Sequence, residues 1–236
     1  MQDKKIKKIF NSISFRYDLA NFFISLGIER YWRLKFLKMI SGSERKILDA
    51  CCGTGYSTIG IVKKLKNHSS IYGVDFSREM LEIACLKSEK YLSDTDRHSD
   101  TIIRFREGDI TDLDFNDNFF ELITIVFGIR NVKDRKKALQ ELYRISSDKG
   151  RLLIMEFNYP GNKFVRKLYD FYLNYIMSSL GAIITGNREA YRYLSESIRN
   201  FPDIADFSSI IEDSGWKILK VLPMTFGTCT IYFAEK

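Results

Sequence analysis

Three aspartates of this chain of 236 residues, Asp49, Asp75 and Asp109, lie within or directly after short apolar runs. If these runs are neighbouring parallel strands, their carboxyl ends meet at one edge of a sheet, and the three carboxylates surround one cleft. Carboxylates in such a cleft can bind an ammonium group, the two hydroxyls of a ribose and the exocyclic amine of an adenine. The spacing therefore indicates a nucleoside-containing ligand that also carries a positive charge.

A turn of small residues, Gly53-Thr54-Gly55, follows the first of these runs and leads into a predicted helix. Glycines let the backbone come close to a ligand, and the start of a helix presents free N–H groups. A nicotinamide dinucleotide fits less well, because its pyrophosphate is bound by a G-x-G-x-x-G turn with no carboxylate nearby. Here Thr58 holds the third glycine position and Asp49 stands before the turn. Taken singly, each feature also fits an ordinary strand–helix turn or a turn-capping aspartate.

The order of apolar segments predicts the frame that positions these residues. Predicted strands and helices alternate, which is typical of a mostly parallel sheet covered by helices on both faces. The last two strands are joined by a short link and must pair antiparallel. Ser77 is expected to cap a helix, and Gly150 is expected to end the preceding segment just before a strand begins. We expect an α/β fold with seven strands, at about 46–51, 71–75, 102–107, 122–127, 151–157, 217–222 and 228–233.

The formal net charge of +7 is unevenly distributed along the chain. Residues 1–45 carry ten Lys/Arg against four Asp/Glu, residues 160–200 carry six against three, and residues 46–159 are neutral. A basic protein suits nucleic acid or an anionic membrane surface. No secretory signal and no metal-binding spacing of Cys and His is present, so we expect a reduced, cytoplasmic protein without a metal.

At this point the sequence resembles the class I methyltransferases that use S-adenosylmethionine, which share a Rossmann-like fold. More narrowly, it is similar over nearly its whole length to the ubiquinone/menaquinone biosynthesis C-methyltransferase family of the UbiE/MenG type. The segments around Tyr17, Arg130 and Tyr191 are specific to that family. The residues that carry the resemblance are Tyr17-Asp18-x-x-Asn21, Ser25-Leu26-Gly27-Ile28, Leu48 to Gly55, Phe127-Gly128-Ile129-Arg130-Asn131-Val132, Glu156-Phe157, and Tyr191 to Arg199.

The resemblance implies a role for each matching residue around the methyl donor. The methionine part would be held by Asp49, Gly53, Thr54 and Gly55, and the ribose by Asp75. The adenine would be flanked by Asp109 and Ile110, and Val126 would contribute backbone near the sulfonium.

The implied reaction is methylation of a ring carbon of a reduced prenylated quinone, with demethylmenaquinol converted to menaquinol and a ubiquinone-pathway benzoquinol as a second substrate. A ring carbon becomes nucleophilic when a neighbouring hydroxyl is deprotonated, so the site must favour a phenolate and exclude water. Arg130 is the candidate for stabilising the phenolate, with Asn131 and Tyr17 as hydrogen-bonding partners of the quinol oxygens. The alternatives are that Arg130 pairs structurally with Glu156 or Asp134, and that Tyr17 only packs.

Two domains are expected: a helical cap at 1–45, and a methyltransferase domain at 46–236 with a helical lid inserted at about 160–200. Both basic segments are rich in aromatic residues, which suits peripheral contact with the inner face of a membrane. We expect a quinol rather than nucleic acid as the partner, because elements used by common nucleic-acid methyltransferases are missing. A methyltransferase acting on RNA or another small aromatic compound, a non-catalytic cofactor-binding protein, and a homodimer stay open.

Overall fold

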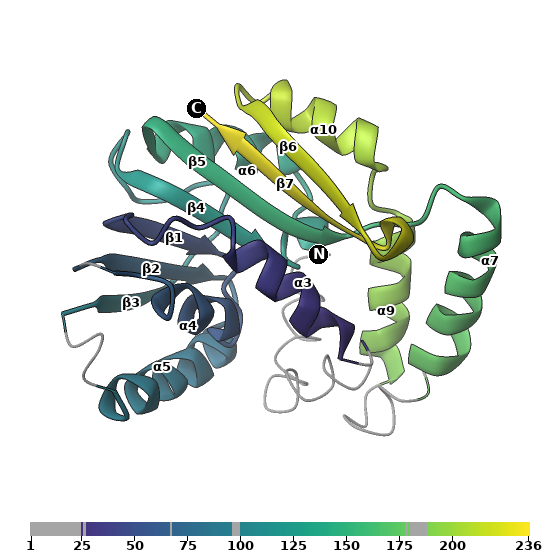
Figure 1. Cartoon of the computed structure of the whole chain (residues 1–236), viewed down its shortest axis with the longest axis horizontal. Helices are drawn as coiled ribbons and strands as arrows, with labels where there is room; N and C mark the ends of the chain where they lie inside the picture. Colours follow the sequence, from purple (N-terminus) through teal and green to yellow (C-terminus); the bar gives the residue numbers. More distant parts are fainter. Residues whose placement is uncertain (1–24, 26, 67, 96–99, 178, 180–187) are drawn as a thin grey trace.

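We analysed a computed structural model of the chain, which describes residue 25 and residues 27–66, 68–95, 100–177, 179 and 188–236. Seven strands form one sheet in the order β3-β2-β1-β4-β5-β7-β6 (Figure 1). The strands are β1 (Lys46–Ala50), β2 (Ser70–Asp75), β3 (Ile102–Glu107), β4 (Phe120–Val126), β5 (Ser146–Phe157), β6 (Lys217–Met224) and β7 (Cys229–Glu235).

The pairing of these strands confirms the predicted fold class. Strands β1 to β5 pair parallel with one another, whereas β7 lies antiparallel between β5 and β6. Only residues 225–228, which include the 3-10 turn Thr225–Gly227, separate β6 from β7, and this link is too short to carry the chain back for a parallel pair. The parallel strands bring the ends of β1 to β4 to one edge of the sheet.

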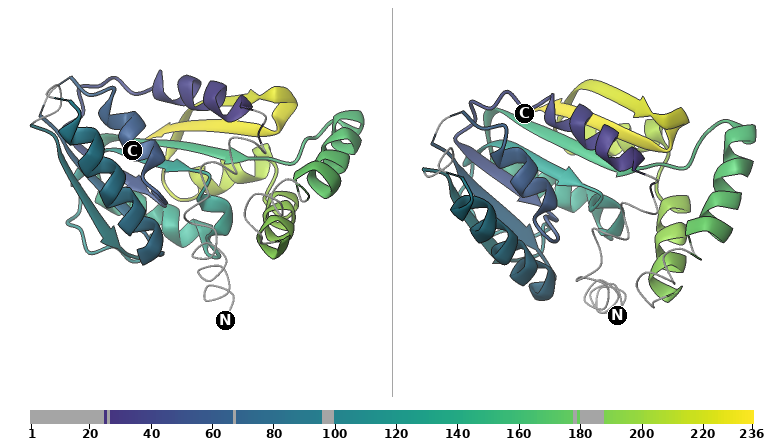
Figure 2. Two further views of the ribbon diagram at one scale, coloured as in Figure 1. Left: turned by 90° about the horizontal axis from the view of Figure 1, so that it is seen from below. Right: turned by 60° about the horizontal axis from the view of Figure 1, so that its bottom comes forward.

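Helices cover both faces of the sheet, because neighbouring residues of each buried strand point to opposite sides. On one side Ile47 belongs to a core with Trp32 and Phe36 of α3 (Ile28–Leu37), α4 (Tyr56–Val62) and the edge of α5 (Arg78–Ser93). On the other side Leu48 belongs to a core with α6 (Arg135–Ile145) and α10 (Ile204–Glu212). Figures 1 and 2 show α3 and α6 on opposite sides of the sheet.

The insert between β5 and α10 has a small core of its own. It contains α7 (Lys163–Phe171), a π-helical segment η4 (Tyr172–Met177) and α9 (Arg188–Arg199). Leu173, Met177 and Tyr191 are buried against one another, and Asp170 forms an ion pair of 3.0 Å with Arg199. Helices α7 and α9 lie beyond the carboxyl ends of the strands (Figure 1). This is the position that a lid over the site requires.

Local sequence signals place most of the boundaries well. The hydroxyl of Ser77 accepts a hydrogen bond from the backbone N–H of Met80, as predicted for the cap of α5, and Asp134 caps α6 in the same way. The prediction for Gly150 was wrong, because β5 begins at Ser146 and runs through this glycine. A Cβ atom at Gly150 would lie 2.2 Å from the Ser146 hydroxyl, so close packing explains the glycine. Of the helical cap expected at residues 1–45, only the helix α3 lies in the described part of the chain.

Candidate cofactor and substrate site

A cavity of about 260 Å³ lies at the edge of the sheet where β1, β2, β3 and β4 end. Its walls come from the segments that follow these four strands and from α3. Among the residues predicted to hold the cofactor, those that line the cavity are Gly53, Thr54, Asp75, Asp109, Ile110 and Val126. The structure therefore brings most of the predicted set together around one volume.

Asp75 organises the turn between β1 and α4. One carboxylate oxygen of Asp75 accepts a hydrogen bond of 2.9 Å from the backbone N–H of Gly53, and the other accepts one of 2.9 Å from Ser77. Gly53 has a φ of +54°, and a Cβ atom there would meet no protein atom within 4 Å. The turn thus leaves open space beside a carboxylate that is held in place, which fits a ribose whose hydroxyls donate to Asp75.

The segment after β3 forms the next part of the wall. Asp109 accepts a hydrogen bond of 2.9 Å from the backbone N–H of Thr111, which fixes the direction of its carboxylate. Ile110 is buried, and Phe76 and Met80 line the same cavity. An apolar slot beside a carboxylate fits an adenine ring and its amine.

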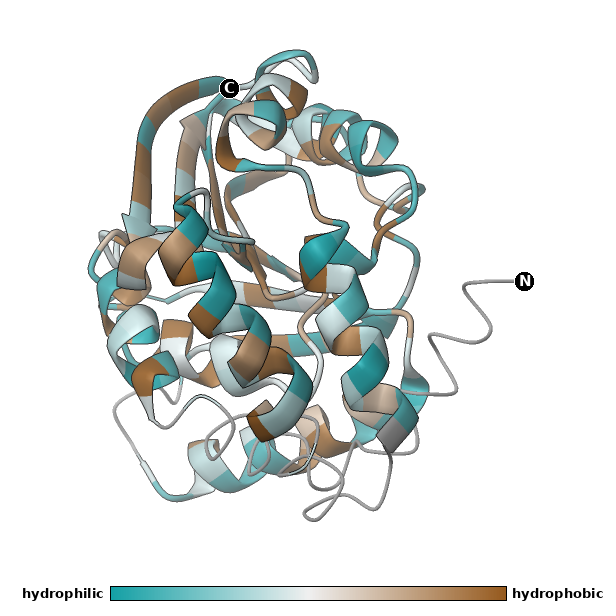
Figure 3. Cartoon of the chain, turned by 90° about the vertical axis from the view of Figure 1, so that its right-hand side faces the viewer, coloured by the Kyte–Doolittle hydropathy of each residue, from teal (hydrophilic) through white to brown (hydrophobic). Residues whose placement is uncertain are grey.

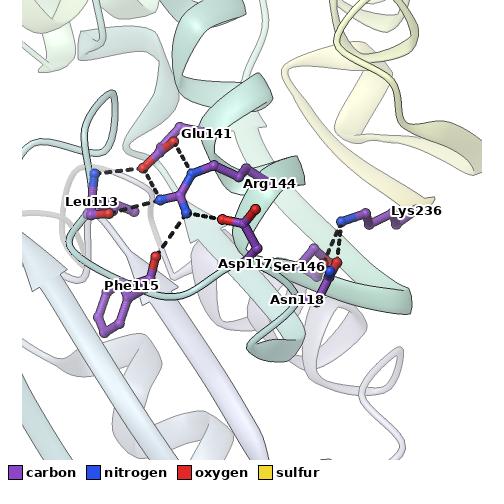
Figure 4. A network of polar contacts seen from close by, with 8 residues as sticks. All are labelled: Leu113, Phe115, Asp117, Asn118, Glu141, Arg144, Ser146 and Lys236. Atoms are coloured by element: carbon purple, nitrogen blue, oxygen red, sulfur yellow. Dashed lines mark hydrogen bonds and ion pairs between the residues drawn. The ribbon is translucent and has the colours of Figure 1, made fainter.

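Arg144 of α6 holds this segment in place from behind (Figure 4). Its guanidinium donates to the carbonyl oxygens of Leu113, at 3.0 Å, and Phe115, at 2.9 Å. It also pairs with Glu141, whose carboxylate accepts a hydrogen bond from the backbone N–H of Leu113. The segment that carries Asp109 and Ile110 is therefore tied to a helix of the core.

Two residues predicted to contact the methionine part, Asp49 and Gly55, lie behind the cavity and not among its lining residues. The carboxylate of Asp49 is buried and accepts hydrogen bonds from the hydroxyls of Thr58, at 2.6 Å, and Thr124, at 2.8 Å. Burial raises the pKa of Asp49 to about 6, although both hydroxyls oppose this shift. A Cβ atom at Gly55 would lie 2.9 Å from that of Ala84, so this glycine lets α5 approach the turn.

Two residues with strained backbone conformations lie where β1 and β4 leave the sheet. Cys51 has a φ of 56° and Phe127 has a φ of 59°, and residues other than glycine rarely adopt such positive φ angles. Gly128, next to Phe127, leaves room for the Cys51 side chain, since a Cβ atom at position 128 would lie 2.3 Å from the Cβ of Cys51. Such conformations cluster at functional sites, and all three residues line the cavity.

Asn131 lines the cavity next to this strained region, whereas Tyr17 lies outside the described residues. The hydroxyl of Tyr193, on α9, donates a hydrogen bond of 3.0 Å to Oδ1 of Asn131. This bond connects the insert to the cavity wall. The two N–H groups of the Asn131 amide are the donors that it can offer to an oxygen of a bound molecule.

Arg130 is buried behind the cavity wall and pairs with Glu156 at the end of β5. The guanidinium lies 2.9 Å from Oε1 of Glu156 and also donates to the carbonyl oxygen of Phe127. The backbone N–H of Arg130 donates to the second oxygen of the same carboxylate, at 3.1 Å. The structure thus contains the ion pair with Glu156 that the sequence offered as the alternative role. A direct part of Arg130 in chemistry stays a prediction.

Several lining residues were not expected from the sequence, above all Arg33 of α3, Tyr56, Ser57, Phe127 and Lys133. No local pattern marks Arg33, because only the packing of α3 across the start of α4 brings it to the cavity. Within the described residues, no three His, Cys, Asp or Glu side chains gather as a metal site requires. Nor does any helix in this part of the chain have the length and apolar character needed to cross a membrane.

Known proteins resemble this chain in sequence and in fold. The chain is 36% identical over 234 residues to the ubiquinone/menaquinone biosynthesis C-methyltransferase UbiE of Rickettsia prowazekii, which covers 98% of this chain and 92% of the relative. It is 30% identical over 233 residues to the demethylmenaquinone methyltransferase of Lactiplantibacillus plantarum, with 98% and 95% covered.

Solved structures share the fold at much lower identity. A SAM-dependent methyltransferase from Aquifex aeolicus superposes with a TM-score of 0.61 at 18% identity, covering 86% of this chain and 88% of the other. Phosphoethanolamine N-methyltransferase 2 of Haemonchus contortus, in complex with S-adenosyl-L-methionine, gives 0.62 at 15% identity, covering 87% and 52%. The model of the ubiE/COQ5 methyltransferase family matches residues 1–236. Since that match spans the whole sequence, the chain belongs to the ubiE/COQ5 methyltransferase family.

Proposed function

We propose that this protein methylates a ring carbon of a reduced prenylated quinone with S-adenosylmethionine as the methyl donor. The substrate is demethylmenaquinol, and a benzoquinol of ubiquinone synthesis is the second candidate. The observation that carries the proposal is membership of the family over the full length, together with a cavity whose carboxylates match the donor. The relatives named above carry C-methyltransferase and demethylmenaquinone methyltransferase in their names.

The cavity residues fit the donor in a definite order. Asp109 and Ile110 would flank the adenine after β3, and Asp75 would hold the ribose after β2. Gly53 and Thr54, after β1, would face the methionine part, and Val126 would lie near the sulfonium. Asp49 and Gly55 support this end from behind, through the shape of the turn. When bound, the donor supplies an electrophilic methyl group on a sulfonium.

The chain's own residues must make the quinol carbon reactive and keep water away. Loss of a hydroxyl proton from the quinol raises electron density on the neighbouring ring carbon, so groups that favour a phenolate speed the reaction. The Asn131 amide can donate to a quinol oxygen, and Phe127 lines the same cavity. We keep Arg130 as an electrostatic contributor to phenolate stability and Tyr17 as a second hydrogen-bonding residue.

Methyl transfer from labelled S-adenosylmethionine tests the proposal directly. The protein is incubated with reduced demethylmenaquinone, with the corresponding benzoquinol, and with tRNA in separate reactions. We expect label in a quinol product and a new ring methyl group by mass spectrometry. Label in tRNA alone would replace this function with RNA methylation, and donor binding without transfer to any acceptor would favour a non-catalytic protein.

We further propose that α7 and η4 of the insert bring the protein to an anionic lipid surface, where a prenylated substrate resides. Phe164, Leu168, Phe171 and Tyr175 recur at helical spacing and are exposed, with 71% of Phe164 accessible. Lys163, Arg166 and Lys167 surround this stripe, and Asp170 is paired with Arg199. Figure 3, which faces the insert, shows hydrophobic and hydrophilic bands alternating along its helices. An apolar stripe with a basic border suits the headgroup region of anionic lipid.

Flotation with liposomes tests this surface. A variant with Phe164, Leu168 and Phe171 changed to Ser should lose binding to liposomes that contain phosphatidylglycerol. The matched control changes Leu219, an exposed residue of β6, to Ser and should bind like the original chain. Equal binding of both variants would contradict the lipid surface. Light scattering of the original chain would separate this role from contact between two copies.

A further inference from the structure

Arg33 is a basic side chain at the end of the cavity where β1 turns into α4. It comes from α3, a helix of the predicted cap, and its side chain is only 15% exposed. Burying a guanidinium is costly unless its N–H groups find partners. The contacts of Arg33 therefore indicate what it is placed to bind.

Protein groups use only part of the Arg33 guanidinium. Nε pairs with Glu29 one turn earlier on α3, and Nη1 donates a hydrogen bond of 2.6 Å to the hydroxyl of Ser57. The face of the group lies 4.6 Å from the centre of the Tyr56 ring, and the Phe127 ring lies at 5.6 Å. Of the five N–H donors, three have no hydrogen-bond partner among the described residues, including both on Nη2.

The electrostatics of the cavity make this end distinct. Asp75, Asp109 and Asp134 line the remainder of the cavity and would repel an anionic group there. Lys133, the other basic lining residue in the described part of the chain, is exposed and belongs to the segment after β4. A ligand that is neutral or positive over most of its length can thus place one carboxylate beside Arg33.

The order of the strands shows which part of the donor reaches this end. Along the sheet edge, Asp109 follows β3, Asp75 ends β2 and Gly53 follows β1, and these strands are direct neighbours. If the adenine lies at Asp109 and the ribose at Asp75, the next group along the edge is the amino-acid part. Arg33 is attached to this third position through Ser57.

We propose that Arg33 binds the α-carboxylate of the methyl donor, and so makes the cap helix α3 part of the donor site. The inference rests on the proposed function, because it assumes a donor of the S-adenosylmethionine type. A planar guanidinium fixed by stacking and by two partners suits a carboxylate better than a flexible ammonium does. Recognition of the carboxylate also selects against adenosine compounds that lack it.

Calorimetry with two ligands that differ only in the carboxylate tests this assignment. The ligands are S-adenosylhomocysteine and its decarboxylated form, 5′-(3-aminopropylthio)-5′-deoxyadenosine. In Arg33→Gln, the dissociation constant for S-adenosylhomocysteine should rise about ten- to a hundredfold, as expected for hydrogen bonds to a charged group. The dissociation constant for the decarboxylated form should change less than about threefold.

Two further variants keep the test decisive. Arg33→Lys retains the charge without the planar fork and should recover part of the affinity for S-adenosylhomocysteine, even if Arg33→Gln folds poorly. Lys35→Gln removes an exposed charge from the same helix and should leave both dissociation constants unchanged. Equal losses for both ligands in both Arg33 variants would show that Arg33 only joins α3 to α4, and would overturn the assignment. If the original chain bound neither ligand, the proposed methyl donor would fail, and this inference with it.

Discussion

The Tyr193 hydroxyl and the Asn131 amide oxygen, 3.0 Å apart, join the inserted helix α9 to the wall of the cavity. Asn131 belongs to a short 3-10 turn, Ile129–Asn131, that begins beside the strained Phe127. With its oxygen engaged, the amide is oriented by the insert and not by the sheet. The insert therefore helps to orient a residue of the cavity wall.

Tyr193→Phe removes this hydrogen bond and keeps the ring. We expect kcat for quinol methylation to fall about five- to tenfold, in line with the loss of one hydrogen bond of about 1 kcal/mol. The dissociation constant of S-adenosylhomocysteine should stay within about twofold, because the donor end is untouched. Tyr31→Phe, at an exposed tyrosine of α3 that does not line the cavity, is the control and should not change kcat. A parallel loss of donor affinity would argue against the positioning role.

Arg130→Ala should lower the free energy of unfolding by about 3–5 kcal/mol, because it leaves the buried Glu156 without its ion-pair partner. We also expect methyl transfer to fall far more than donor affinity. The double variant Arg130→Met, Glu156→Leu removes both charges and should restore most of the stability in urea unfolding. If this double variant also methylates quinol at the original rate, Arg130 has no electrostatic role in the reaction.

Arg144→Ala releases the segment that carries Asp109 and Ile110. We expect a loss of about 1–2 kcal/mol in unfolding free energy, since the guanidinium is partly exposed and several of its partners are carbonyl oxygens. The dissociation constant of S-adenosylhomocysteine should rise several-fold. Lys136→Ala removes an exposed ion pair from the same helix and should cost at most about 0.5 kcal/mol. An unchanged donor affinity in Arg144→Ala would show that the segment keeps its position without the arginine.

Stability should depend on pH through Asp49. The pKa of this carboxyl is about 6 in the folded protein, above its usual value of 3.8, because the side chain is buried. The folded state then holds a proton that the unfolded state has lost, so stability falls as pH rises from about 4 to 6. Asp49→Asn cannot titrate and should lack this component, on the order of 2–3 kcal/mol. Urea midpoints at pH 4.5 and 7.5 compare the two proteins, and identical pH slopes would contradict the shift.

The spacing of apolar residues and the residue types at turns were enough to predict the sheet, because both signals come from residues close together in the sequence. The near-continuous apolar residues of β4 indicate a buried strand, and the capping residue Ser77 indicates the start of a helix. The common location of Asp75 and Asp109, both predicted to contact the cofactor, followed from the same logic, since strand ends in a parallel sheet share one edge. Strand β5 was predicted too short, because Gly150 was interpreted as a stop and not as a close contact with Ser146.

Residues that depend on packing between distant segments were harder to predict. Arg33 reaches the cavity only because α3 crosses the start of α4, and Tyr193 reaches Asn131 across 62 positions of sequence. The spacing that suggested Asp49 as a ligand-contacting residue does not distinguish the front of a turn from its back. In the structure Asp49 is buried behind Thr58 and Thr124 and does not line the cavity, and its contact with the methionine part stays a prediction.

The two tryptophans of the chain lie in different halves of the core. The indole of Trp32 packs edge-on against Phe127 and Phe157 and donates to the Thr225 hydroxyl. Trp216 packs against Tyr143 on the other face of the sheet and donates to the Leu139 carbonyl. The protein thus contains two intrinsic fluorophores, each of which is sensitive to the packing on a different face of the sheet. With Trp216 replaced by Phe, emission follows events at the wall shared with Phe127, and with Trp32 replaced by Phe, it follows the packing of α6 and α10.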